Sequence, residues 1–118
     1  VPGANDNLTG VATLLGVAQA LRRAPVAGLR VLLVSTGSEE SFMEGMQAFA
    51  ARHFPDLPVA DTHVICIDTV GSGTLTLLEG EGMLVMRDYP EDFKALVARA
   101  ADAVEQHAAE SQRRIECA

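Results

Sequence analysis

Basic residues, aromatic residues and long apolar runs are all scarce in this sequence of 118 residues, which contains no tryptophan. Lysine and arginine total 9 against 16 acidic residues, and the net charge is −7. No basic run exists that could neutralise the phosphates of a nucleic acid, so we expect no nucleic-acid partner. The aliphatic stretches are far shorter than the roughly 20 residues that cross a bilayer, so we expect no transmembrane segment.

Cysteine is also scarce, and two cysteines do not make a disulfide framework. No secretory signal opens the chain. The first residue is not methionine and the opening reads as the middle of a loop, so we expect a fragment of a longer protein. The length suits one domain, and the hydrophobic fraction of 48% is ordinary for a globular chain with a core.

Apolar periodicity, strand-like runs and turn residues divide the chain into alternating helices and strands. We expect helices over residues 9–23 and 42–53 and from Pro90 onward, and strands over residues 29–35, 63–68, 74–79 and 83–86. Thr9 is the expected N-cap of the first helix, and Pro55 should stop the second. Glu91 and Asp92 suit the first turn of the last helix.

This order of elements predicts an α/β fold. The strand over residues 29–35 is apolar on both faces, as in a central parallel strand that helices cover. Three or four strands make only an incomplete sheet, however. We therefore expect an exposed sheet edge that is met by other residues or by a second copy, so that self-association is possible.

Four acidic residues follow or precede these elements in a way that indicates a site. Glu39 and Glu40 come just after the first strand, Asp68 ends the second, and Asp6 stands immediately before the first helix. Ligands gather outside the carboxyl ends of the strands in an open α/β sheet. Adjacent carboxylates also need a cation, a proton or an arginine to offset their repulsion. We therefore expect these acids to converge on one site.

The segments around the acids resemble the metal-binding motifs of the M28 family of zinc aminopeptidases. The first reads GANDNLTGVA from Gly3 to Ala12, the second reads SEE from Ser38 to Glu40, and the third reads IDTVG from Ile67 to Gly71. Their order and spacing match those of the family, over roughly residues 2–89. Three ordered motifs are much more specific than any one of them.

The resemblance implies a three-layer α/β/α zinc-peptidase-like fold with a mostly parallel, mixed sheet, and residues 1–118 would be part of its catalytic domain. It implies two zinc ions, with Asp6 bridging them, Glu40 on one and Asp68 on the other. Glu39 would be the catalytic general base that takes a proton from the attacking water. The substrate would be a peptide with a free N-terminus. The family also suggests a cis peptide after Asp6 and a secreted or membrane-anchored protein.

Histidine is where this sequence departs from the family, which supplies one histidine to each metal. None of the five residues before Asp6 is a histidine, and the only histidine after Asp68 is His107, inside the last predicted helix. His53 and His63 match no motif. We therefore expect neither tight zinc binding nor turnover from this chain alone, since both imidazole ligands are missing.

Two alternatives remain open at this stage. One is a glutaminyl-cyclase-like acyl transfer on the same scaffold, with a single zinc ion. The other is a non-catalytic peptidase-like module that serves interaction, which the missing histidines and the exposed sheet edge favour. The intact set of acids is mildly against the second alternative, because a purely structural domain has no need to hold carboxylates together.

Overall fold

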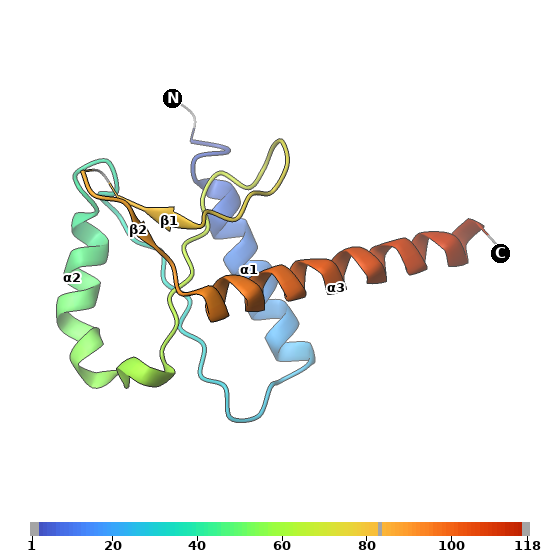
Figure 1. Cartoon of the computed structure of the whole chain (residues 1–118), viewed down its shortest axis with the longest axis horizontal. Coiled ribbons are helices and arrows are strands. Elements are labelled where there is room, and N and C mark those ends of the chain that lie inside the picture. Colours follow the sequence, from blue (N-terminus) through green and yellow to red (C-terminus); the bar gives the residue numbers. More distant parts are fainter. Residues whose placement is uncertain (1–2, 83, 117–118) are drawn as a thin grey trace. The chain divides into compact units, whose positions relative to one another are not determined.

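A computed structural model of the chain describes residues 3–82 and 84–116, with side chains as far as residue 108. The elements follow one another as α1 (Leu8–Arg23), α2 (Glu44–His53), two short 3-10 turns (Phe54–Asp56 and Val59–Asp61), β1 (Gly80–Glu81), β2 (Arg87–Asp88) and α3 (Glu91–Glu116) (Figure 1). They fall into two compact units, Val1–Thr74 and Leu75–Ala118, which we describe separately.

Helix α1 begins one residue earlier than the sequence predicts, and its N-cap is Asn7 instead of Thr9. The Asn7 side chain accepts a hydrogen bond from the backbone N–H of Gly10, which satisfies one of the donors left free at a helix start. Thr9 lies inside the helix, where its hydroxyl donates to the carbonyl oxygen of Asn5 at 2.6 Å. The prediction of a helix is confirmed, and the prediction of its cap is wrong.

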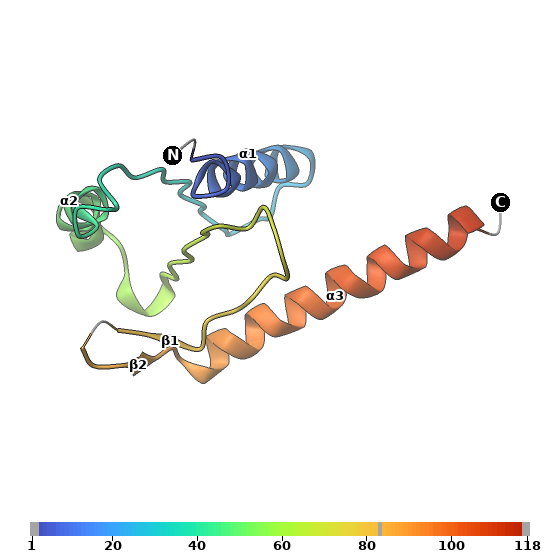
Figure 2. The same ribbon diagram turned by 90° about the horizontal axis from the view of Figure 1, so that it is seen from above.

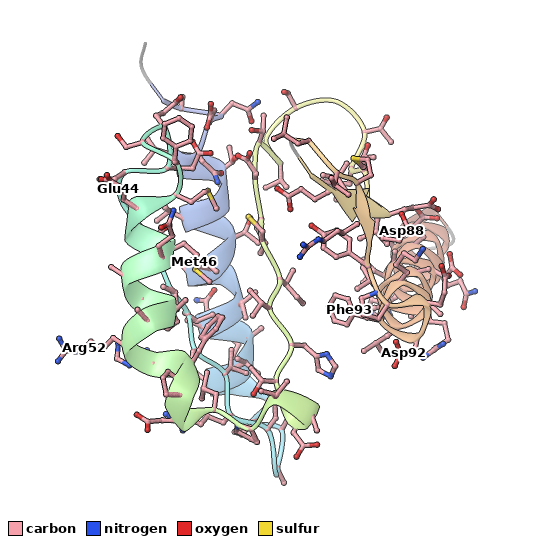
Figure 3. The ribbon with its side chains drawn as sticks, turned by 60° about the vertical axis from the view of Figure 1, so that its left-hand side comes forward. Glu44, Met46, Arg52, Asp88, Asp92 and Phe93 are labelled. Carbon is pink, nitrogen blue, oxygen red and sulfur yellow. The ribbon has the colours of Figure 1, made fainter. Side chains whose placement is uncertain are left out.

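Helix α2 begins at Glu44, later than predicted, because Phe42 and Met43 have left-handed φ angles of 59° and 61°. A helix cannot start through such residues. Glu44 in the first turn and Arg52 in the last both suit the helix dipole, and Figure 3 shows them at opposite ends of the helix. The predicted helix is confirmed from residue 44 to residue 53.

The predicted strands over residues 29–35 and 63–68 do not form in this structure. Both segments run as coil in Figure 1 and again in Figure 2. A strand belongs to a sheet only where a neighbour pairs with its backbone, and the sheet of the described residues joins β1 and β2 instead. Their apolar side chains are accordingly exposed, as at Val31 (41%) and Ile65 (65%). The helices are confirmed, but the parallel sheet and its three layers stay a prediction.

The second unit contains the described sheet, an antiparallel pair in which Gly80 lies opposite Asp88 and Glu81 opposite Arg87. The two predicted strands over residues 74–79 and 83–86 are therefore misplaced: β1 falls between them, and β2 follows the second. Met83 is outside the described residues. Tyr89 closes the pair, because its N–H donates to the carbonyl oxygen of Glu79 at 2.8 Å and its hydroxyl donates to Glu81 Oε2 at 2.6 Å.

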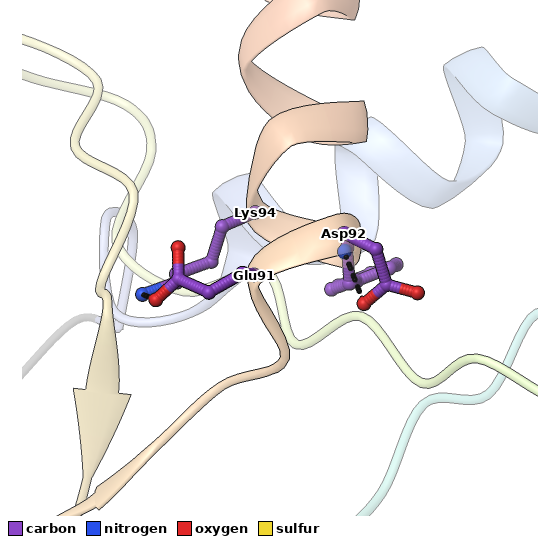
Figure 4. A network of polar contacts seen from close by, with 4 residues as sticks. Glu91, Asp92 and Lys94 are labelled. Carbon is purple, nitrogen blue, oxygen red and sulfur yellow. Dashed lines mark hydrogen bonds and ion pairs between the residues drawn. The ribbon is translucent and has the colours of Figure 1, made fainter.

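Helix α3 starts directly after this hairpin, as the sequence predicts. The carbonyl oxygen of Pro90 accepts from the N–H groups of Phe93 and Lys94 at 3.1 and 3.0 Å. Glu91 and Asp92 occupy the first turn (Figure 4). None of the helices among the described residues combines the length and the apolar character that a membrane crossing requires.

The ion pair at the start of α3 gives a small testable effect. Lys94 Nζ lies 2.6 Å from Glu91 Oε1. The hydrogen bond that Lys94 donates to Glu91 raises the pKa of Lys94 above 10.5. A raised lysine pKa contributes stability that is present at neutral pH and is lost as the pH rises through that pKa. Glu91→Gln should therefore lower the pKa of Lys94 in an NMR titration, and a pKa that stays raised would contradict the assignment.

Candidate functional site

Asn7 joins the loop that carries Asp6 to the segment that carries Asp68. Its Nδ2 group donates to the carbonyl oxygen of Ile67 at 2.8 Å. Its Oδ1 atom accepts from the N–H groups of Gly10 at 2.9 Å and of Thr69 at 3.4 Å. One side chain therefore contacts the first turn of α1 and both neighbours of Asp68.

Asn5, on the other side of Asp6, makes a second link to the same segment. Its Oδ1 atom accepts from the N–H of Gly71 at 2.9 Å, and its Nδ2 group donates to Ser72 Oγ at 3.0 Å. The two asparagines flank Asp6 in sequence and bind residues on both sides of Asp68. The loops of Asp6 and Asp68, which are far apart in sequence, consequently lie side by side.

Two glycines permit this close approach. A Cβ atom on Gly10 would lie 2.5 Å from Asn7 Oδ1 and 2.7 Å from the carbonyl oxygen of Ile67. A Cβ atom on Gly71 would lie 2.5 Å from Asn5 Oδ1. Among the residues that the structure describes with side chains, Gly10 is the one that is buried. The contact between the two loops is therefore tightly packed.

The backbone at both acids has an unusual conformation. The peptide bond between Asp6 and Asn7 is cis, as the resemblance to the family suggests. Thr69 has a φ angle of 49°, which a β-branched residue rarely adopts. Its hydroxyl donates to Asp68 Oδ1 at 2.8 Å within its own loop, and its N–H donates to Asn7 Oδ1 in the other loop.

The loop of Glu39 and Glu40 is held by contacts of its own. Ser38 has a left-handed φ angle of 56°. The carbonyl oxygen of Glu39 accepts from the N–H of Met43 at 2.9 Å, and that of Ser38 accepts from the N–H of Glu44 at 3.2 Å. These bonds fix the loop against the start of α2. Among the described residues, no hydrogen bond joins the side chains of Glu39 or Glu40 to the loops of Asp6 and Asp68.

The four carboxylates are all exposed, and the structure brings the loops of two of them together. In the part of the chain that the structure describes, no group of three or more histidine, cysteine, aspartate or glutamate side chains is placed to hold a metal ion. Of the three loops that we expect to converge, the structure brings together those of Asp6 and Asp68. The roles of Asp6, Glu39, Glu40 and Asp68 stay predictions.

Comparison with known proteins identifies the family. The model of peptidase family M28 matches residues 1–116. The chain belongs to peptidase family M28. No curated protein and no solved structure matches it. Membership of the M28 family confirms the resemblance drawn from the three motifs, and it makes the chain a member of a family of peptidases, which are hydrolases.

Zinc is the metal that M28 peptidases generally use, so the residues of this chain can be tested against it. Carboxylate oxygen is a suitable zinc ligand. The arrangement does not fit, however, because the described residues gather no set of three ligands. The carboxylates of this M28 chain have the right chemistry, but as arranged here they do not make a zinc site by themselves. We therefore derive no catalytic step through a metal.

Sequence reasoning found the acids and missed the residues that connect them. Asn5, Asn7 and Gly71 lie inside the first and third motifs, but the sequence assigns no role to any of them. One signal could have found Asn7, since asparagine is a preferred N-cap and stands just before the helix. The hydrogen bonds to Ile67 and Gly71 have no signal in the sequence, because they join residues more than 60 positions apart.

Proposed function

We propose that this chain supplies the carboxylates of a dizinc aminopeptidase centre that hydrolyses the peptide bond next to a free N-terminus. The observation that carries the proposal is the pairing of the Asp6 and Asp68 loops through the asparagines on either side of Asp6. It supports a shared site because carboxylates carried by adjoining loops are suitable ligands for one metal centre.

Each carboxylate has a distinct role in this proposal. Asp6, Glu40 and Asp68 would hold the two zinc ions, with Asp6 shared by both ions. Zinc supplies Lewis-acid polarisation of the scissile carbonyl when it is bound. Glu39 would not be a ligand, and its carboxylate would take the proton of the attacking water and give it to the nitrogen of the leaving amine. The hydrogen bond from Met43 to the Glu39 carbonyl oxygen supports this role, since it fixes the backbone of that residue.

The rest of the proposal concerns what surrounds these residues. The remaining zinc ligands come from residues other than Asp6, Glu40 and Asp68. The three-layer α/β/α fold forms when other strands pair with residues 29–35 and 63–68. Exposure of the apolar side chains in both segments supports this pairing. The proposal also includes self-association through these two segments. Its substrate is a peptide with a free N-terminus.

Replacing Asp6 should weaken metal binding more than replacing any loop acid elsewhere. Asp6→Asn removes a bridging charge and should lower zinc and manganese affinity at least tenfold in calorimetric titrations, or abolish binding where it is already weak. Asp56→Asn is the matched control, since it removes an exposed charge from the turn after α2. Equal zinc affinity of the two variants would show that Asp6 is not a ligand.

A non-catalytic module is the second candidate, favoured by the lack of three gathered ligands among the described residues. An assay of the full-length protein separates the candidates. Hydrolysis of aminoacyl-nitroanilides supports the aminopeptidase, and cyclisation of peptides with N-terminal glutamine supports an acyl transferase. Absence of both activities in a zinc-loaded protein supports the module.

A further inference from the structure

We infer that Asn7 is a positioning residue that sets the place of Asp68 relative to Asp6. The inference deepens the proposed function, and it rests on that function only where zinc is concerned. Asn7 follows Asp6 directly in the chain, so any force on its side chain acts on the backbone of Asp6. Its amide contacts Ile67 and Thr69, the two neighbours of Asp68. No other described side chain is bonded to both neighbours of that acid.

The chemistry of the contact requires an amide at this position. The partner of Nδ2 is the carbonyl oxygen of Ile67, which can only accept. The partners of Oδ1 are two backbone N–H groups, which can only donate. A side chain that fits must therefore offer a donor and an acceptor at once. Aspartate keeps the acceptor and places a second carboxylate oxygen against the Ile67 carbonyl oxygen.

Asn5 provides a control of the same type one residue before Asp6. Its acceptor also bonds to a backbone N–H, that of Gly71. Its donor, however, bonds to the hydroxyl of Ser72, which can turn and donate instead. Asn5→Asp therefore keeps both contacts, whereas Asn7→Asp loses one and creates a repulsion. The two substitutions make the same chemical change and add the same charge next to Asp6.

The first experiment needs no metal. Amide hydrogen exchange at Thr69, measured by NMR on the full chain, reports whether the segment of Asp68 is held. Repulsion from the Ile67 carbonyl oxygen should move the segment of Asp68 away from the acceptor that aspartate keeps. We therefore expect exchange at Thr69 to be about fivefold faster in Asn7→Asp than in the wild type, and unchanged in Asn5→Asp. Equal exchange in the two variants would overturn the inference, whatever the chain does with zinc.

The second experiment measures zinc affinity by calorimetry on the full-length protein with the same substitutions. An added negative charge should strengthen cation binding by Coulomb attraction alone. A misplaced Asp68 should instead weaken binding about tenfold in Asn7→Asp, as is usual for groups that orient a ligand. Asn5→Asp should bind zinc as tightly as the wild type or more so. Tighter binding in both variants would mean that Asn7 acts through charge and would refute positioning.

Two further measurements separate positioning from a loss of folding. The visible absorption of bound Co²⁺ reports the geometry of its ligands, and it should change in Asn7→Asp and stay constant in Asn5→Asp. Asn7→Ser keeps a good N-cap for α1 but is too short for the full contact. It should retain the helical circular dichroism and still speed exchange at Thr69. A full-length protein that binds no zinc defeats the proposed function, while exchange at Thr69 still decides the role of Asn7.

Discussion

Gly10→Ala should destabilise the first unit by about 2–3 kcal/mol, although alanine is the better helix former by about 1 kcal/mol. The added Cβ atom would lie 2.5 Å from Asn7 Oδ1 and 2.7 Å from the Ile67 carbonyl oxygen, both closer than real Cβ contacts. Relieving that clash must move Asn7 away, which removes the N-cap of α1 and separates the two loops. A lost cap alone costs about 1 kcal/mol.

Gly16→Ala is the matched control, because it makes the same change in the same helix. A Cβ atom on Gly16 would meet nothing within 4 Å. Here helix propensity acts alone, so the variant should be more stable than the wild type by about 0.5–1 kcal/mol. Chemical denaturation followed by circular dichroism measures both. Stabilisation by both alanines would show that the contact at Gly10 is not tight in solution.

The helices could be predicted because their signals are local. Residues 9–23 show apolar residues at helical spacing, end with Arg22 and Arg23 and precede Pro25, and the observed α1 spans Leu8–Arg23. The start of α2 was misplaced because periodicity does not reveal left-handed residues such as Phe42 and Met43. Backbone conformation at a helix start depends on contacts of the loop, which a pattern of apolar residues does not contain.

The strands were predicted from side chains, and side chains alone do not decide which segments pair. Residues 29–35 have the composition of a central strand, but pairing is a property of two segments. Composition can show that a segment is ready to pair, and it cannot show that a neighbour is present. Among the described residues, pairing occurs instead where Gly80 and Glu81 meet Arg87 and Asp88, over a short turn that brings them together locally.

The candidate site shows the same difference between local signals and long-range contacts. The acids Asp6, Glu39, Glu40 and Asp68 were found from their place at the ends of elements and from the order of three motifs. Their mutual arrangement could not be found in this way, since it depends on the long-range bonds of Asn5 and Asn7. Residue type predicts which chemistry a site can perform, whereas position depends on neighbours that no motif names.

Glu39→Gln should lower kcat for hydrolysis of an aminoacyl-nitroanilide by about 10²–10⁴-fold in the zinc-loaded full-length protein, the usual range for a general base. Glutamine has nearly the same shape but cannot take a proton from the attacking water. Because Glu39 is not a zinc ligand in our proposal, zinc affinity should stay within about twofold of the wild type.

Glu40→Gln separates the two adjacent acids. It should lower zinc affinity as well as kcat, because Glu40 is the proposed ligand. Glu44→Gln removes an exposed carboxylate from the first turn of α2 and should change neither quantity. The comparison of the change in zinc affinity with the change in kcat is decisive. A glutamate that only repels its neighbour would raise zinc affinity when neutralised and leave kcat almost unchanged. If Glu39→Gln weakened zinc binding as much as Glu40→Gln, the two residues would have to exchange or share their roles.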